Sequence, residues 1–524
     1  MRCAIVIACA LVVASCGPPD PCPDGDGDGW DASECGGGDC DDDRADVHPS
    51  AEEVCADGLD NNCDGRPGPC GLSGTVAVAD AGLTLLGTNS SDLLGNGLAG
   101  HVSLGSSPVP ALAVGAPGVE QLNGLPVSGV VYVLDAGSFE GTDPLQADAI
   151  LYAGSGGPSN LGRPLKGATD LDGDGQTDLI VSNQVDSDGG IGYVIRGPVE
   201  TGETALSNSD ASYRGTAWTT AACQEEPAFL SFLFYIDYGF EAADLTGDGL
   251  PDIVFAEAGE ALRDGPGSVY VFSWPVDGEF GPESAAATVV GDTVCSATGW
   301  SVGATGDLDD DGQTDLAVGA PLEPGADGAS GAVYVVHGPL AGDIPASTAD
   351  STIRSPYPEL GRVVVTPGDV TGDGVDDLLI LAERTHGVSY VFAGPLPSGD
   401  LDTAAADATI GWVEGSGSSE PRITNASSAG DVNGDGVADL LLTTKVDDAY
   451  QVRLIYGPVV GTRDLAEADA VFVGDWPLEY FPAVGVGDLN ADGYGDIGIG
   501  NPRSDVNGAE SGAAYIFFGR PTPL

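Results

Sequence analysis

From residue 74 onward the chain alternates short apolar runs with turns rich in glycine, proline and aspartate. Leu316–Gly319 and Val333–Val336 are typical of the apolar runs. Short runs with many β-branched residues, bounded by turn residues, predict strands rather than helices. We therefore expect an all-β fold over residues 74–524.

These strands belong to a repeated unit, in which a nine-residue loop rich in aspartate is followed by two apolar strands and a segment like Ala406–Ala408. The loops begin at residues 170, 244, 307, 369, 431 and 488, and a period of about 60 residues is typical of propellers and solenoids. An earlier unit contains Leu112–Pro117, which matches Leu316–Pro321, but its loop, Ser103–Ala111, has no acidic residue. Seven units of four short strands predict a seven-bladed β-propeller of four-stranded blades.

The two ends of the repeat region complement each other. The region opens with Ala79–Leu83, which resembles a fourth strand, and closes with Ala513–Phe517, which resembles a third strand. Pairing them in one blade would cover two strand edges and close the ring.

The aspartates of the six loops form a candidate metal set. Oxygen-bearing side chains at positions 1, 3, 5 and 9 of a tight loop suit a hard cation such as calcium. An EF-hand is excluded because position 12 is apolar in every loop, whereas an EF-hand needs glutamate there; a solvated acidic turn is the remaining alternative. The candidate ligands are Asp170, Asp172, Asp174, Asp178, Asp244, Thr246, Asp248, Asp252, Asp307, Asp309, Asp311, Asp315, Asp369, Thr371, Asp373, Asp377, Asp431, Asn433, Asp435, Asp439, Asp488, Asn490, Asp492 and Asp496.

The loop pattern, followed by an apolar strand and Gly-Ala-Pro, resembles the FG-GAP repeat of integrin α-chain propellers over residues 74–524. The resemblance implies about six calcium ions and a non-enzymatic protein that binds proteins or glycans. The loops depart from the pattern where Thr246, Thr371, Asn433 or Asn490 replaces the acid at position 3, and Ala491 stands at position 4 of the last loop. We expect weaker sites there and one of the tightest sites in the loop of Asp307.

The first residues predict export. Arg2 precedes an apolar run, Cys3–Val13, and the small residues Val13–Ser15 lead to Cys16. The run is too short to span a bilayer, so residues 1–16 are interpreted as a lipoprotein signal peptide whose Cys16 is lipidated, a buried N-terminal strand being the alternative. The mature protein is then expected outside the cytoplasm, anchored by lipid to the outer membrane or cell surface.

Residues 17–73 form a second small module with six cysteines between Cys22 and Cys70. Disulfides, metal or both must hold it, because so short a segment buries little core. The segment resembles a bacterial Cys/Asp metal-binding motif and, in its first aspartates, thrombospondin type 3 calcium repeats; zinc on the cysteines is the rival interpretation. The fifteen possible cysteine pairings stay open. Its candidate metal ligands are Asp24, Asp26, Asp28, Asp39, Asp41, Asp57, Asp60, Asn62 and Asp64.

The charge excludes several partners. The chain has 81 acidic and 17 basic residues, a formal net charge of −64. Nucleic acids and anionic lipid surfaces would be repelled, since both are bound through lysine and arginine. We expect contact with a membrane only through the lipid anchor, and a monomer.

An active site is not evident in the sequence. Gly299–Gly303 fits the Gly-x-Ser-x-Gly string, but it aligns with the first strand of other units rather than with a strand-turn-helix elbow. One loop is long and aromatic, Phe229–Tyr235, and a Cys223–Cys295 disulfide could hold it over the face opposite the aspartate loops as a binding site. The alternative, slightly favoured, is that this aromatic run packs in the core of a larger blade. A recognition protein is favoured over a structural envelope component, and both over a polysaccharide lyase.

Overall fold

The computed structural model divides the chain into two compact units, residues 1–71 with 521–524 and residues 72–520. The second unit is described except for residues 108, 136–140, 155–160, 168, 184–190, 216–239, 259–264, 326–329, 383–386, 413–421, 448 and 477–480. Of the first unit, the structure describes residues 40, 41, 44, 45, 47–49, 63 and 71.

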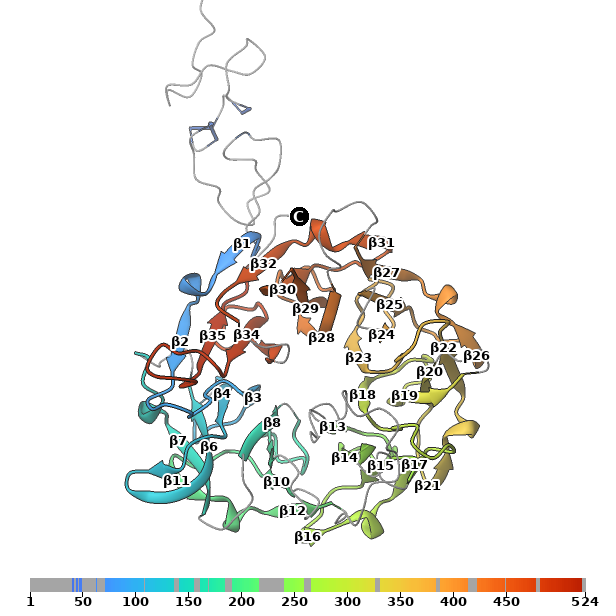
Figure 1. Cartoon of the computed structure of the whole chain (residues 1–524), viewed down its shortest axis with the longest axis horizontal. Coiled ribbons are helices and arrows are strands. Elements are labelled where there is room, and N and C mark those ends of the chain that lie inside the picture. Colours follow the sequence, from blue (N-terminus) through green and yellow to red (C-terminus); the bar gives the residue numbers. More distant parts are fainter. Residues whose placement is uncertain are drawn as a thin grey trace, which may run out of the picture. The chain divides into compact units, whose positions relative to one another are not determined.

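The larger unit is a β-propeller whose strands are arranged around a centre (Figure 1). The strands nearest the centre are the first strands of the sequence units, and each packs beside the first strand of a neighbouring unit, including β33 beside β3. These first strands are β3 (Gly97–Val102), β8 (Leu161–Gly167), β13 (Phe240–Ala243), β18 (Ser301–Gly306), β23 (Val363–Gly368), β28 (Arg422–Gly430) and β33 (Ala483–Gly487).

Three further strands follow outward from each first strand, mostly antiparallel to one another. The second strands are β4 (Ala111–Ala116), β9 (Leu179–Asn183), β14 (Asp252–Ala256), β19 (Asp315–Pro324), β24 (Asp377–Ala382), β29 (Asp439–Val446) and β34 (Asp496–Asn501). The third are β6 (Leu125–Leu134), which also pairs with β5 (Gln121–Leu122), β10 (Ile191–Ile195), β15 (Ser268–Phe272), β20 (Ser330–Val336), β25 (Val388–Phe392), β30 (Ala449–Ile455) and β35 (Ala513–Phe517). The fourth are β7 (Ala149–Gly154), β12 (Ala211–Arg214), β17 (Ala287–Val290), β22 (Ser351–Arg354), β27 (Ala408–Gly411), β32 (Ala470–Val473) and β2 (Leu83–Leu86).

A fifth strand, absent from the predicted four-stranded blade, lies at the outer edge of most sheets. It comes from the connection between the third and fourth strands of the next unit and runs parallel to the fourth strand that it covers. We call these the bridging strands: β11 (Gly202–Ala205), β16 (Gly278–Phe280), β21 (Gly342–Pro345), β26 (Gly399–Asp402), β31 (Gly461–Asp464) and β1 (Gly74–Ala77). A 3-10 turn follows each: η4 (Leu206–Asn208), η6 (Pro282–Ser284), η7 (Ala346–Thr348), η8 (Thr403–Ala405), η9 (Leu465–Glu467) and η2 (Val78–Asp80), and η3 (Pro144–Gln146) precedes β7.

The predicted number of seven blades is wrong. The described strands form six hydrogen-bonded sheets, one of eleven strands, four of five strands and one of four. The eleven-stranded sheet contains the first two sequence units, because β6 pairs with β8 at Gly129 and Leu161. Gly129 has a φ of 100°, and an added Cβ would lie 2.7 Å from the Leu161 nitrogen, so only glycine lets the two backbones approach here. Counted by its sheets, the propeller has six blades.

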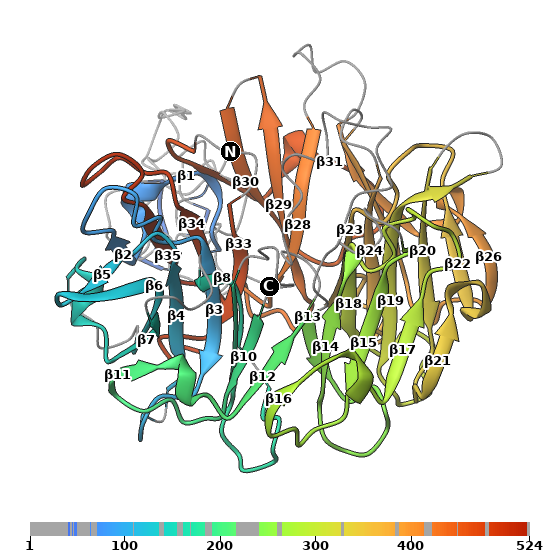
Figure 2. The ribbon, with the colours of Figure 1, turned by 60° about the horizontal axis from the view of Figure 1, so that its bottom comes forward.

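The core lies between facing sheets. Ala317 and Val333 of one sheet pack with Ile380 of the next, and all three are fully buried. This explains why the second and third strands are apolar on both faces, whereas the bridging strands, which lie at the rim, are mostly exposed. Figure 2 shows the sheets standing side by side in this way.

Ring closure follows the prediction and adds a second contact. β2 pairs antiparallel with β35, Leu83 opposite Ile516, so the first fourth strand and the last third strand share one sheet. β1 also pairs parallel with β32, Gly74 opposite Ala470. The residues before and after η2 thus join two different sheets at the C-terminal end of the ring.

The smaller unit contains a disulfide between Cys40 and Cys63, whose Cα atoms are 5.5 Å apart. This disulfide reduces the fifteen pairings that the sequence leaves open to three, since four cysteines remain. Val47 is buried, and its N–H donates to the carbonyl of Arg44 in a turn. Within the described residues, none of the helical segments has the length and apolar character required to cross a bilayer.

Candidate metal loops

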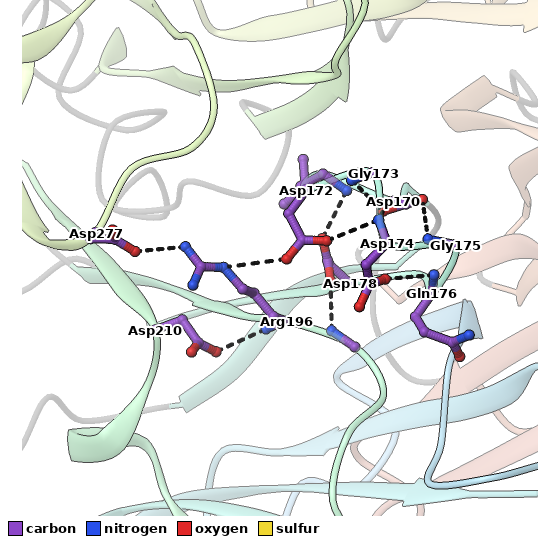
Figure 3. A network of polar contacts seen from close by, with 12 residues as sticks. Asp170, Asp172, Gly173, Asp174, Gly175, Gln176, Asp178, Arg196, Asp210 and Asp277 are labelled. Carbon is purple, nitrogen blue, oxygen red and sulfur yellow. Dashed lines mark hydrogen bonds and ion pairs between the residues drawn. The ribbon is translucent and has the colours of Figure 1, made fainter.

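The six aspartate loops share one geometry, which begins with the carboxylate at position 1. In the loop of Asp170, Oδ1 accepts the N–H groups of Gly173 and Asp174 at 2.8 and 3.1 Å, and Oδ2 accepts that of Gly175 at 2.7 Å (Figure 3). The N–H groups of positions 5 and 6 make the same bonds in the other five loops. The first aspartate therefore folds each loop around itself.

The loop backbone requires left-handed residues at positions 4 and 6. Gly173 and Gly175 have φ values of 75° and 87°, a region that glycine adopts without strain. Ala491 at position 4 of the last loop has a φ of 59°, and Asp310 occupies the same position with a φ of 63°. The chain keeps the turn at these two positions at the cost of local strain, which is of order 1 kcal/mol for a residue with a Cβ.

In the loop of Asp170, the carboxylates at positions 3 and 5 each accept the backbone N–H of the residue two positions later. Asp174 Oδ1 accepts the N–H of Gln176 at 2.8 Å, and Asp172 Oδ1 accepts that of Asp174 at 3.2 Å. Asn433 makes the same contact as Asp172 in its own loop, at 3.0 Å. Each carboxylate keeps lone pairs that these single bonds do not use.

Threonine at position 3 behaves differently from the predicted ligand. The hydroxyl of Thr246 donates to Asp252 Oδ1 at 3.1 Å, and that of Thr371 to Asp377 Oδ1 at 3.4 Å. Both hydroxyls point back toward position 9. The structure thus brings these two residues into the loop as supports for the last aspartate.

Position 9 is buried in all six loops; it is the first residue of the second strand in five of them, and in the sixth, Asp178 directly precedes β9. The Oδ2 atom of position 9 accepts the N–H of position 2 at 2.7–2.8 Å, as in the pair Val432 and Asp439. In five loops Oδ1 also accepts the N–H of a glycine after the third strand, such as Gly457 at 2.9 Å from Asp439. The sequence pattern did not reveal that these glycines donate to the aspartate at position 9.

Burial acts on the acidity of these carboxyl groups. Because desolvation outweighs the two N–H donors, the pKa rises to about 6 for Asp178, Asp315, Asp377 and Asp496 and to about 7 for Asp439. The pKa of Asp252 is raised for the same reason. A nearby cation would reverse this effect by favouring the ionised form.

Neighbouring loops are also linked to each other. The carbonyl of Val370, at position 2, accepts the N–H of Val459 from the next unit at 2.7 Å, and the carbonyl of Leu308 accepts that of Leu396 at 2.7 Å. Gly457, two residues before Val459, is the donor to Asp439. These loops are therefore held by their own last aspartates and by the units that follow them.

The residue before that glycine was missed by sequence reasoning. In the second unit it is Arg196, whose Nε lies 3.7 Å from Asp172 Oδ2 and whose Nη2 lies 2.6 Å from Asp277 Oδ1 (Figure 3). In the fourth unit it is His337, with Nδ1 2.8 Å from Asp309 Oδ2. A comparison of the residues before each Gly-Pro would have pointed to them.

The donor set fits a hard divalent cation. Carboxylate oxygens of Asp170, Asp172 and Asp174 lie within 4.8 Å of one another, as do those of Asp307, Asp309 and Asp315. Oxygens that share a calcium ion at about 2.4 Å can be at most about 5 Å apart, so both groups match such an ion. Oxygen ligands alone favour calcium or magnesium over softer metals.

The other residues singled out in the sequence are partly within the described structure and partly outside it. Of the candidate ligands in the N-terminal module, the described residues include Asp41; the others, and Cys16, lie outside them. Cys295 is in a disulfide, but Cys223 and Phe229–Tyr235 lie outside the described residues. Ser301 lies in β18, where it is buried and its Oγ accepts the N–H of Val364 at 2.7 Å, so it holds two strands together rather than facing a substrate.

Comparison with known proteins supports the resemblance. The FG-GAP repeat matches residues 298–336 and 480–517, and the metal-binding motif of the Cu-binding MopE family matches residues 39–67. Integrin alpha-PS5 of Drosophila melanogaster is 33% identical over 172 residues, which are 31% of this chain and 16% of that protein. Integrin alpha-5 of Xenopus laevis is 32% identical over 166 residues, 29% of this chain and 15% of that protein. The chain thus spans about one sixth of the length of these integrins.

One solved structure is similar at low identity. The WD40 domain of Toxoplasma gondii coronin covers 84% of this chain with 89% of its own, at 13% identity and a TM-score of 0.42.

Proposed function

We propose that the chain is a calcium-binding, non-enzymatic recognition module that acts outside the cytoplasm. The observation that carries the proposal is the convergence of three loop carboxylates within 4.8 Å in two loops, at positions 1, 3 and 5 in the loop of Asp170 and at positions 1, 3 and 9 in the loop of Asp307. The FG-GAP match and the integrin relatives support adhesion or recognition as the role. The ligand is a protein or a glycan, and the Asp loops act by fixing the shape of the ring.

Calcium would contribute mainly to stability. For a dissociation constant of ~10⁻⁴ M and ~1 mM calcium, each site adds about 1.4 kcal/mol, so six sites add about 8 kcal/mol. This is comparable to the stability of a whole domain. We expect chelation to lower the melting temperature strongly and calcium to restore it.

The test is metal analysis of the purified chain together with thermal melting. The native protein should bind about six calcium ions, Asp307→Asn should bind one fewer, and the matched control Asp343→Asn, an exposed carboxylate of β21, should bind as many as the native protein. An unchanged melt after complete removal of calcium would rule out the structural role of the loops.

The recognition role needs a separate test. The calcium-loaded protein, immobilised on beads, is exposed to cell-envelope proteins and to a glycan array, with and without chelator. Binding that depends on calcium supports the proposal, and failure to bind any of these would favour a purely structural envelope component. A polysaccharide lyase would instead be revealed by cleavage of the arrayed glycans.

Anchoring at Cys16 completes the proposal. The apolar run Cys3–Val13 and the small residues before Cys16 are the support. Labelling with a radioactive fatty acid should mark the native chain and not Cys16→Ser. Labelling of both chains would contradict lipidation at this residue.

A further inference from the structure

Position 3 of the aspartate loops lies beside the residue that precedes the glycine after the third strand. In the second unit, Arg196 reaches from this position to Asp172 and Asp277 (Figure 3). Its Nε is buried and makes no hydrogen bond to any group that the structure describes, while Asp172 Oδ2 is 3.7 Å away. Its guanidinium carbon also lies 5.1 Å from the centre of the Trp274 ring. Asp277 and Trp274 thus hold the guanidinium against the loop.

The type of residue that precedes this glycine correlates with the type of residue at position 3 of the loop. The two loops that have aspartate at position 3, Asp172 and Asp309, have Arg196 and His337 beside them. The four loops with threonine or asparagine at position 3 have neither arginine nor histidine there; the residues are Ser273, Ala393, Tyr456 and Phe518. A nitrogen donor therefore accompanies the extra carboxylate in this chain.

Arg196 offsets one of the carboxylate charges of its own loop. The loop of Asp170 has four aspartates, and the adjacent Arg196 leaves a net charge of −3, the same as in a loop with three aspartates. Arg196 also occupies the Oδ2 side of Asp172, so Oδ1 is the oxygen left for a cation. A fixed positive charge so close to the site opposes a second cation through Coulomb repulsion.

We infer that Arg196 is an affinity-limiting residue of the loop at Asp170, a built-in counter-ion that lowers its affinity for divalent and trivalent cations. The inference rests on the proposed binding of cations by these loops. It also replaces the expectation that four carboxylates by themselves make the tightest sites.

The experiment uses terbium(III) as a luminescent substitute for calcium, with the full chain. Trp274 lies beside Arg196 and can transfer excitation to an ion in this loop, but it also follows Ser273, which contacts Thr246 of the loop of Asp244. The luminescence that disappears both in Trp274→Phe and in Asp170→Asn therefore belongs to the loop of Asp170. Calcium then displaces terbium and gives its own affinity. We expect Arg196→Gln to bind both ions about tenfold more tightly, since a unit positive charge is removed.

Two further variants sharpen the result. Asp172→Asn, which keeps Arg196, should bind about tenfold more weakly, and the double variant Arg196→Gln with Asp172→Asn should return to about the native affinity. The matched control is Arg214→Gln, because Arg214 pairs with Glu279 at 3.2 Å outside any loop; its affinity should equal that of the native chain.

The outcomes separate the two proposals. If the native chain binds neither terbium nor calcium, the cation-binding function fails and the inference fails with it. If the native chain binds but Arg196→Gln binds equally or more weakly, Arg196 is only a structural support and the inference alone is overturned. Circular dichroism of each variant shows whether a loss of affinity comes from unfolding.

Discussion

The loop Ser103–Ala111 and the loop Asp170–Asp178 belong to the same eleven-stranded sheet and connect equivalent strands, yet only the second has acidic residues. The acid-free loop still joins β3 to β4 in register. Serine hydroxyls and backbone groups hold it instead: Ser107 Oγ accepts the N–H of Val109 at 3.3 Å, Ser103 Oγ accepts that of Thr177 at 2.8 Å, and the Ser103 carbonyl accepts the N–H of Val199 at 2.8 Å. At position 9 it has the buried Ala111 in place of aspartate.

The comparison of the two loops distinguishes the role of the aspartates at positions 1, 3 and 5 from that of the aspartate at position 9. A unit of this propeller can form its strands without any carboxylate in the loop, so positions 1, 3 and 5 are not needed for the strand pairing. The aspartate at position 9 is different, because it receives buried N–H groups that would otherwise lack a partner. The acid-free loop avoids that need by placing an apolar residue there.

The largest effect that tests this comparison is the pH dependence of the metal-free protein. The folded-state pKa of Asp178, Asp315, Asp377, Asp439 and Asp496 lies above the ordinary value of 3.8. In this pH range the folded state binds more protons than the unfolded state, so their stabilising contribution is complete below about pH 4 and is lost as the pH rises through 6 to 7. Between pH 5 and 7.5 we expect a loss of about 1 kcal/mol per loop, about 5 kcal/mol in all, measured by urea unfolding in chelator.

Two controls belong to this measurement. Calcium should remove or reverse the trend, since a cation favours the ionised carboxylates. Asp439→Asn should make the free energy of unfolding less dependent on pH, because one titrating carboxyl group is removed. Metal-free protein that is more stable at pH 7.5 than at pH 5 would contradict the assignment.

The next effect concerns a single position 9. Asp439→Ala removes the acceptor of the Val432 and Gly457 N–H groups, and two buried donors without partners cost about 3 kcal/mol. Urea unfolding in chelator isolates this loss from any loss of calcium. Asp439→Asn, which keeps one acceptor oxygen, should lose less. A change below about 0.5 kcal/mol in Asp439→Ala would mean that position 9 serves only the cation.

A smaller effect is expected at position 1. Asp170→Ala removes the acceptor of three N–H groups, but the loop is partly exposed and water can replace the carboxylate. We expect about 1 kcal/mol of destabilisation in chelator, as for the loss of a helix N-cap. In calcium the loss should be larger by the contribution of one site. Equal losses in both conditions would show that this loop holds no cation.

The smallest effect belongs to the acid-free loop. Ser107→Ala removes a hydroxyl with two weak bonds, at 3.3 Å from the Val109 nitrogen and 3.4 Å from Asp135 Oδ2. The stability should change by less than about 0.5 kcal/mol and should not depend on calcium. A calcium-dependent change would reveal a cation in this loop as well and would erase the distinction between the two loops.

Much of the fold was predictable because the strands follow from local patterns of apolar residues in the sequence. The apolar runs gave the second and third strands, and the complementary ends gave the pairing of Leu83 with Ile516. The bridging strands were not predicted, since they are short and exposed and have no apolar alternation. Their recurring first glycine, as in Gly342 and Gly399, was the available signal.

The number of sheets could not be predicted for a physical reason. It depends on a single backbone pairing between Gly129 and Leu161. A repeat pattern in the sequence does not predict such a contact. In the loops, the residue types indicated ligands at positions 1, 3, 5 and 9, but the partners of position 9 and the hydroxyls of Thr246 and Thr371 depend on how distant strands pack. Arg196 was missed because its partner Asp172 is distant in sequence.

The closure of the ring by β1 and β2 has a consequence for the order of events during synthesis. The segment Gly74–Leu86 leaves the ribosome before any other part of the ring, whereas its partners Ala470–Val473 and Ala513–Phe517 leave last. At about 5–20 residues per second this interval is on the order of tens of seconds. During that time β1 and β2 lack the strands that they pair with in the sheets, and the ring exists as an open arc with two bare edges. The strands that are synthesised first are therefore the last to pair.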